Sequence, residues 1–98
     1  MTTEFNAEHA PRWREDVSGQ RFGADFIILD AEGNTLRGLN ETAVEVWMLC
    51  DGTRTARALV ELVSQRHGWE VERVLTDTLK FLTELRRLGL IDAVEEVR

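Results

Sequence analysis

Few residues in this chain could carry out covalent chemistry, and their positions do not suit it. Cys50 is the only cysteine, and the two histidines are His9, in a polar N-terminal stretch, and His67, at the predicted end of a helix. Nucleophilic catalysis needs a Ser, Cys or Thr beside a base that a third group orients, and we find no such grouping. Free cysteines are commonly buried, so we expect Cys50 to pack as a small apolar side chain and His67 to interact with the carboxyl end of its helix. The sequence therefore predicts a protein with no catalytic residues.

Motifs that hold metals or phosphates are also missing from the sequence. It has no C-x-x-C or Cys/His ligand spacing, and its glycines form neither a G-x-G-x-x-G nor a Walker pattern. Paired carboxylates such as Glu70 and Glu72 fall near a predicted helix end, where charges are usually solvated. We therefore expect no metal and no cofactor.

The composition favours one small acidic domain. The 98 residues are 43% hydrophobic and 31% charged, and the formal net charge is -6. This charge supplies no basic field to attract a phosphate backbone, which disfavours nucleic acid as a partner. No apolar run approaches the roughly 20 residues of a membrane helix, and the polar, acidic N-terminus does not resemble a signal peptide. We expect a cytoplasmic protein that does not bind membranes.

The first part of the chain has the pattern of short strands separated by glycines. Residues 22–29 are the strongest candidate, because apolar side chains alternate between two faces. One face would carry Phe22, Ala24, Phe26 and Ile28. Residues 30–34 have turn chemistry, and residues 35–39 return as a short strand. With residues 12–17 as a weaker candidate, the pattern predicts a hairpin that a further strand extends to a three-stranded sheet.

From Asn40 onward the apolar period becomes helical. Asn40 and Thr55 can cap two helices, because their side-chain oxygens accept hydrogen bonds from free backbone amides of the first turn. Gly68 and Gly89 stand where the second and third helices should end. The third helix covers about residues 71–88, and its predicted buried stripe comprises Val71, Val74, Leu75, Thr78, Leu82 and Leu85.

These elements predict an α+β domain, winged helix-turn-helix-like, in which a small three-stranded antiparallel sheet is followed by three helices that pack on one side of it. We expect residues 1–11, which end at the only proline, to form a flexible N-terminal tail. Residues 12–92 would form the domain and residues 93–98 a C-terminal tail. Leu90 and Ile91 would either add a short strand or close the core.

A winged helix with this outline raises the alternative of a DNA-binding transcriptional regulator. In residues 70–88 four acidic and four basic side chains balance: Glu70, Glu72, Asp77, Glu84, Arg73, Lys80, Arg86 and Arg87. Four carboxylates on the helix that would have to enter a groove repel the nucleic-acid backbone. The charge pattern therefore disfavours DNA binding.

Two segments of the sequence resemble the PqqD family, the small proteins of coenzyme PQQ biosynthesis and their stand-alone relatives. Residues 39–55 are LNETAVEVWMLCDGTRT and residues 77–91 are DTLKFLTELRRLGLI. The matching features, in order, are Leu39-Asn40, Ala43, Trp47, Asp51-Gly52, Thr55, Asp77, Phe81-Leu82, Leu85 and Gly89-Leu90. The similarity spans about residues 11–92, and it rests on the order and spacing of these features together.

This resemblance implies a RiPP recognition element, a module that binds the leader of a ribosomally made precursor peptide and delivers it to a modifying enzyme, often a radical SAM protein. In that family the leader adds as a strand to the edge of the third strand and lies against the third helix. Carried over to this sequence, the docking edge would consist of Thr35, Leu36, Arg37, Gly38 and Leu39. The opposite wall would come from Asp77 and Phe81.

The residues themselves are compatible with strand addition. An open strand edge offers unpaired N–H and C=O groups to an extended peptide, and Gly38 lets another backbone approach closely. Arg37 would pair with an acidic leader or simply keep the edge soluble. Phe81 would either line the cleft or pack in the core, and Asp77 would either face the peptide or pair with a neighbouring base on its helix.

The sequence leaves two further contacts open, one with a partner enzyme and one with a second copy of the chain. Trp13 and Trp69 are either peripheral core or exposed anchors for a partner enzyme. An open strand edge can also pair with its own copy, so a homodimer is a further possibility.

Overall fold

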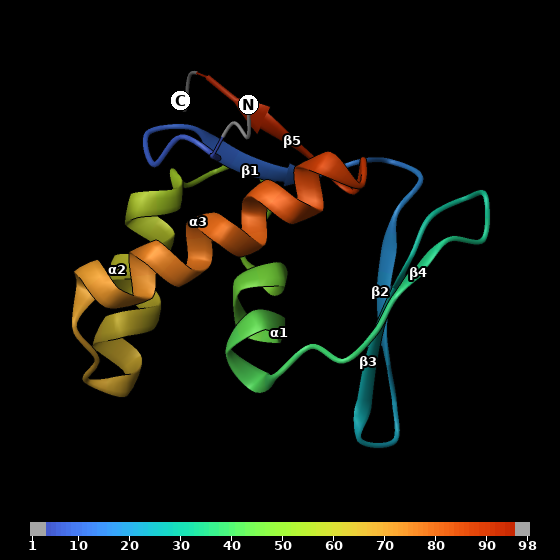
Figure 1. Cartoon of the computed structure of the whole chain (residues 1–98), viewed down its shortest axis with the longest axis horizontal. Helices are drawn as coiled ribbons and strands as arrows, with labels where there is room; N and C mark the ends of the chain where they lie inside the picture. Colours follow the sequence, from blue (N-terminus) through green and yellow to red (C-terminus); the bar gives the residue numbers. More distant parts are fainter. Residues whose placement is uncertain (1–3, 96–98) are drawn as a thin grey trace.

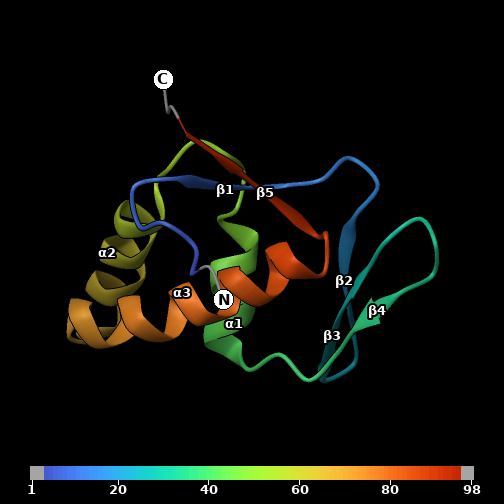
Figure 2. The same cartoon turned by 45° about the horizontal axis from the view of Figure 1, so that its top comes forward.

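The computed structural model describes residues 4–95, which form five strands and three helices. In chain order they are β1 (Ala10–Trp13), β2 (Ser18–Phe22), β3 (Asp25–Leu29), β4 (Thr35–Leu36), α1 (Glu41–Met48), α2 (Ala56–His67), α3 (Val71–Arg87) and β5 (Ile91–Val94). In Figures 1 and 2, α3 crosses α1, the β2–β4 sheet stands to one side of the helices, and the β1–β5 pair lies along another side. This confirms the predicted α+β winged fold and adds a second, two-stranded sheet.

The three-stranded sheet, called the wing below, has the antiparallel order β2-β3-β4. The expected single strand over residues 22–29 is wrong, because Gly23 and Ala24 form a tight turn that separates β2 from β3. Gly23 has a φ of 62°, a conformation that β-branched and bulky residues rarely adopt, so the turn is set at this glycine. Phe22 consequently lies opposite Asp25 in the ladder and is 54% exposed.

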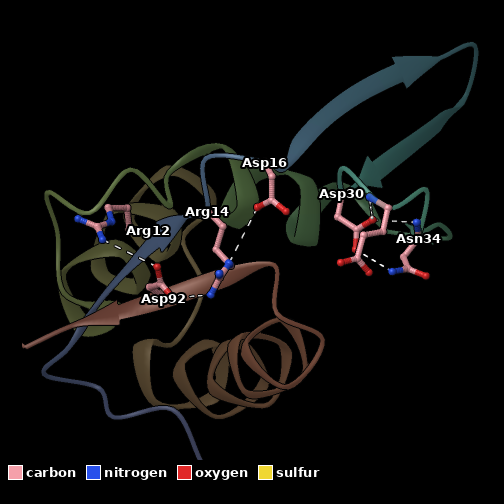
Figure 3. A network of polar contacts seen from close by, with 7 residues as sticks. Arg12, Arg14, Asp16, Asp30, Asn34 and Asp92 are labelled. Carbon is pink, nitrogen blue, oxygen red and sulfur yellow. Dashed lines mark hydrogen bonds and ion pairs between the residues drawn. The ribbon is translucent and has the colours of Figure 1, made fainter.

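The third strand is shorter than expected. β4 pairs with β3 only through Thr35 and Leu36, and residues 37–40 continue without regular structure to α1. The turn before β4 is closed by Asp30, whose carboxylate accepts hydrogen bonds from the Asn34 side chain and from the backbone N–H groups of Glu32 and Asn34 (Figure 3). The bond from the Asn34 side chain is the main reason that the pKa of Asp30 lies below its usual value.

The starts of α1 and α2 and the end of α2 lie where local chemistry predicts. Asn40 Oδ1 accepts a hydrogen bond from Ala43 N at 2.8 Å, and Thr55 Oγ1 accepts one from Ala58 N at 3.1 Å. Gly68 ends α2 with a φ of 69°, in the left-handed conformation that releases the chain from the helix. In α3 the predicted stripe is confirmed, since Val74, Leu75, Thr78, Leu82 and Leu85 are buried and Val71 is half-buried.

The wing is joined to the helices through Trp47 of α1. A Cβ added at Gly19 of β2 would lie 2.5 Å from Trp47 Nε1 and 2.8 Å from the Phe26 ring, so only glycine fits between these two aromatic side chains. Arg21, also on β2, pairs with Glu41 at the start of α1 at 3.6 Å. The position of the wing relative to α1 therefore depends on close packing at Gly19.

The N-terminal residues do not form the expected loose tail. Phe5 is only 2% exposed and packs in the core, and its backbone N–H donates to Thr83 Oγ1 of α3 at 2.6 Å. The adjoining β1 pairs with β5 on one side, while Pro11 O accepts from Gly52 N at 2.9 Å on the other. The Phe5 side chain and the backbone of β1 therefore anchor a segment whose polar composition predicted a flexible tail. Residues 1–3 of the expected tail lie outside the described residues.

The expected C-terminal tail also begins later than predicted. Ala93 and Val94 belong to β5, which pairs with β1 in antiparallel register. Asp92 lies 3.8 Å from Arg12 and 3.3 Å from Arg14, and both ion pairs are visible in Figure 3. Backbone pairing between the two ends of the domain, with these exposed ion pairs beside it, orders the strand; residues 96–98 lie outside the described part.

Among residues 4–95, no helix is both long and apolar enough to cross a membrane.

Candidate functional site

A cavity lies between the start of α1 and the first half of α3. Its volume is about 730 Å³, within the roughly 300–1,000 Å³ range of ligand-binding pockets. It is called the α1–α3 pocket below. Its lining consists of Asn40, Thr42, Ala43, Val46, Gly68, Trp69, Glu70, Arg73, Val74, Asp77, Thr78 and Phe81.

One face of α3 forms a whole wall of this pocket. Arg73, Asp77 and Phe81 are spaced by four residues, and Val74 and Thr78 stand directly beside the first two, which places all five on one side of the helix. Val74 and Thr78 are buried, Phe81 is half-buried, and Arg73 and Asp77 are exposed. The wall is therefore apolar toward the core and charged toward solvent.

The opposite wall comes from α1 and the residues before it. Val46 is 1% exposed, and Thr42 and Ala43 are half-buried. The carboxamide oxygen of Asn40 is already engaged as the helix cap. This wall therefore contributes mainly shape and apolar surface.

The turn between α2 and α3 closes one end of the pocket with an aromatic side chain. The Trp69 ring stacks on the His67 ring with centroids 4.1 Å apart and planes 12° apart. His67 Nε2 lies 2.7 Å from Glu45 Oε2, and an N–H of Arg66 donates to Glu45 Oε1 at 3.1 Å. Partial burial alone would raise the pKa of Glu45, but the hydrogen bonds from His67 and Arg66 outweigh it and leave the pKa below its usual value.

The predicted docking edge adjoins the pocket without lining it. β4 lies at the border of the wing, and within residues 4–95 its only ladder partner is β3. Thr35, Arg37 and Gly38 are exposed, whereas Leu36 and Leu39 are half-buried against the core. The edge leads directly to Asn40, the first residue of the pocket lining.

The structure thus separates the predicted site residues into two groups. It brings Asp77 and Phe81 together in the α1–α3 pocket, and it leaves residues 35–39 outside the lining. Phe81 both lines the pocket and packs against the core cluster, so neither expectation for it excludes the other. Within residues 4–95, no ion pair links Asp77 to Arg73 or Lys80.

The two tryptophans left open by the sequence differ in their surroundings. Trp13 is half-buried, its indole N–H donates to Trp47 O at 2.8 Å, and its ring lies 6.1 Å from the Trp47 ring. Trp69 is 44% exposed at the pocket. Trp13 is therefore peripheral core, and Trp69 is available to a ligand.

Cys50 is fully buried, as expected, but it lies two residues beyond the end of α1 and not on the helix itself. Its thiol donates to Val46 O at 3.2 Å, and burial raises the pKa of this thiol to about 12, with a further contribution from the neighbouring Asp51. A thiol with this pKa is not a nucleophile at neutral pH. In the described part of the chain, His, Cys, Asp and Glu side chains do not gather into a group that could hold a metal ion.

Sequence reasoning missed most of the pocket lining. Arg73, Val74 and Thr78 share the helical face of Asp77 and Phe81, so the spacing of three and four residues could have identified them once two members were known. Trp69 carries a weaker signal, an aromatic residue directly after a helix-ending glycine.

Three solved structures share this fold. One is the solution NMR structure of the PqqD truncation of Methylobacterium extorquens PqqCD, described as a functional and stand-alone RiPP recognition element. It has 22% sequence identity and a TM-score of 0.79, and the match covers 93% of this chain and 97% of that one.

The other two structures contain leader peptides. TbiB1 in complex with the TbiA(beta) leader peptide has 16% identity and a TM-score of 0.71 over 83% of this chain and 94% of that one. Lasso peptide synthetase B1 complexed with its leader peptide has 18% identity and a TM-score of 0.71 over 84% of this chain and 96% of that one. At these identities the likeness establishes the fold.

No curated protein sequence matched this chain. The sequence model of the family described as coenzyme PQQ synthesis protein D (PqqD) matches residues 25–91, which is more than half of the chain. These residues run from β3 to the start of β5 and include the edge of β4 and the whole α1–α3 pocket. On the strength of this match, the protein belongs to the PqqD family.

Proposed function

We propose that this protein is a RiPP recognition element, a non-catalytic module that binds the leader of a ribosomally synthesised precursor peptide. The observation that carries the proposal is the continuity of two surfaces: the edge strand β4 and the irregular residues 37–39 that follow it lead at Asn40 into a pocket that contains Asp77 and Phe81. Two structural relatives with the same fold hold leader peptides, which supports a peptide as the ligand here.

Strand addition supplies most of the affinity in this proposal. An extended leader would pair with backbone groups of Thr35, Leu36, Arg37, Gly38 and Leu39, and side-chain pockets would decide which peptide is accepted. Gly38 has a φ of 77° and nothing within 4 Å of an added Cβ, so a ligand backbone can approach it closely. Arg37 is exposed and would pair with a leader carboxylate, an interaction of about 0–1 kcal/mol.

The bound peptide would then be presented to a modifying enzyme, for which a radical SAM protein is the leading candidate within this family. Coenzyme PQQ synthesis is one such pathway, and the proposal extends to other ribosomally made peptides. Precursor peptides are made by ribosomes, so we place the protein's work in the cytoplasm.

A titration followed by amide NMR tests the proposal. The probe is an isotopically unlabelled synthetic leader, taken from a short precursor peptide encoded beside this protein's gene, added to the ¹⁵N-labelled protein. We expect shifts at residues 35–39 and on the face of α3 that carries Arg73, Asp77 and Phe81. Shifts confined to Arg86 and Arg87 on addition of duplex DNA, with none from the peptide, would instead indicate a transcriptional regulator.

Self-association is tested in the same samples. Light scattering with and without the leader should give the mass of one chain of 11.2 kDa, plus that of the peptide when it is bound. A dimer that dissociates when peptide is added would mean that the edge pairs with its own copy in the absence of leader.

A further inference from the structure

Trp69 is the largest side chain that lines the α1–α3 pocket, and it is 44% exposed. A covered aromatic side chain buries about 150–250 Å² in typical cores and interfaces, so an exposed indole gains free energy when a ligand packs on it. The turn that carries Trp69 begins with Gly68 in the left-handed conformation, which directs the chain from α2 into α3. The indole is therefore positioned by a structured turn and not by a loose loop.

A second observation shows how the indole is held. Its ring stacks on His67, with centroids 4.1 Å apart, and His67 in turn lies 2.7 Å from a carboxylate oxygen of Glu45. The Glu45 side chain is only 21% exposed, and its other oxygen accepts from Arg66. The Trp69 ring is thus held before any ligand arrives by its own turn, by His67 of α2 and, through His67, by Glu45 of α1. This arrangement lowers the entropy lost on binding.

The interior of the pocket is apolar next to this ring. Val46 and Val74 are 1% and 9% exposed, and Ala43 and Phe81 are half-buried. The charged lining residues, Glu70, Arg73 and Asp77, are all exposed and so lie at the rim. An apolar interior with a charged rim accepts a large apolar side chain whose backbone stays outside.

We infer that Trp69 is the wall that selects one bulky apolar side chain of the bound peptide, aromatic or branched aliphatic, and that His67 and Glu45 are positioning residues for this wall. The inference rests on the proposed function, because the selected side chain belongs to the leader. It adds that specificity resides at the α2–α3 turn, some thirty residues along the chain from the strand edge.

Peptide selection tests the role of Trp69. A display library of random 15-residue peptides is selected on the wild-type protein and on Trp69→Ala. On the wild type we expect one position restricted to Phe, Tyr, Trp, Leu or Ile. Trp69→Ala should bind the enriched wild-type peptide at least ~10-fold more weakly, as expected for a contact at the centre of an interface, and should relax that position. Phe22→Ala is the matched control, because Phe22 is an aromatic residue that is 54% exposed and lies outside the pocket lining.

Three further variants test the positioning residues. His67→Ala removes both the stack and the hydrogen bond, His67→Phe keeps a ring that can stack, and Glu45→Gln keeps an oxygen that can accept from His67. We expect peptide affinity to fall in the order wild type, Glu45→Gln, His67→Phe, His67→Ala. The ring protons of Trp69, assigned with Trp69→Phe, should lose their upfield ring-current shift in His67→Ala alone, and thermal unfolding reports whether each variant is folded.

The outcomes separate this inference from the proposed function. Failure to enrich any peptide on the wild type, together with no binding of the synthetic leader, overturns the proposed function. Enriched peptides without a restricted apolar position, or an unchanged selection on Trp69→Ala, overturn the role of Trp69 while peptide binding stands. A His67→Ala protein that loses the ring-current shift but keeps full affinity overturns the positioning role.

Discussion

The strand edge at residues 35–39 and the α1–α3 pocket offer a peptide different kinds of contact. The edge presents backbone groups and exposed side chains, and only two of its residues belong to the β3–β4 ladder. The pocket presents side chains from α1, α3 and the turn between α2 and α3, on a wall whose apolar part is buried. Backbone pairing is nearly independent of sequence, whereas a pocket distinguishes side chains by size. Under the proposed function, affinity and selectivity therefore belong to different parts of this small domain.

The largest expected effect on stability comes from disrupting the close packing of Gly19 against Trp47, which holds the wing beside α1. Gly19→Ala places a methyl group 2.5 Å from Trp47 Nε1 and 2.8 Å from the Phe26 ring, so these side chains or the backbone of β2 must shift. We expect the free energy of unfolding to fall by about 1–3 kcal/mol, as in other overpacked cores, measured by urea denaturation. Gln20→Ala, on the exposed neighbouring position of β2, should change it by less than about 0.5 kcal/mol. Equal stability of both variants would show that the wing position does not depend on this contact.

A proline in the docking edge measures how much the backbone N–H groups contribute to leader affinity. Arg37→Pro removes one N–H that strand addition would use, and we expect the leader to bind about 10-fold more weakly, a change of roughly 1.4 kcal/mol. Arg37→Ala keeps the N–H and removes only the charge, so its affinity should fall less than about 5-fold. Isothermal titration calorimetry measures both. If the two variants lose affinity equally, the edge acts through the charge of Arg37 and not through its backbone.

Acid pH should weaken the support of the Trp69 wall. The pKa of Glu45 is lowered in the folded protein, so Glu45 contributes stability above the usual glutamate value of 4.5 and loses it as the pH falls through the lowered folded value. We expect Glu45→Gln to flatten this part of the curve of unfolding free energy against pH. The curve is measured by chemical denaturation from neutral pH to below the usual value. Parallel curves for the two proteins would mean that the bonds to His67 and Arg66 contribute nothing.

The smallest expected effect is at the charged rim of the pocket. Asp77 is exposed and has no ion pair within the described residues, so Asp77→Asn should leave stability unchanged. Its effect on leader affinity should stay below about 5-fold, because exposed charge pairs contribute about 0–1 kcal/mol. Calorimetry at low and high salt measures it. A loss of 10-fold or more would move Asp77 from the rim into the centre of the peptide interface.

Local chemistry made much of the fold predictable. The caps at Asn40 and Thr55, the helix end at Gly68 and the buried stripe of α3 all depend on residues within one or two turns of each other. Asp77 and Phe81 were assigned to the helical wall by resemblance, and both line the pocket. Where a single backbone angle overrides a periodic pattern, as at Gly23, the prediction of one strand over residues 22–29 was wrong.

The sequence by itself therefore determined the order of the elements, the faces of the helices and the acidic charge that disfavours nucleic acid. Only the tertiary structure decided that Phe5 belongs to the core, that β1 and β5 close the domain, and that Trp69 meets His67 and Glu45 beside the α1–α3 pocket. The physical reason is the distance along the chain between the residues that interact. Caps, turns and helical stripes are set by neighbours along the chain, whereas burial and stacking depend on side chains that tens of residues separate until the core forms.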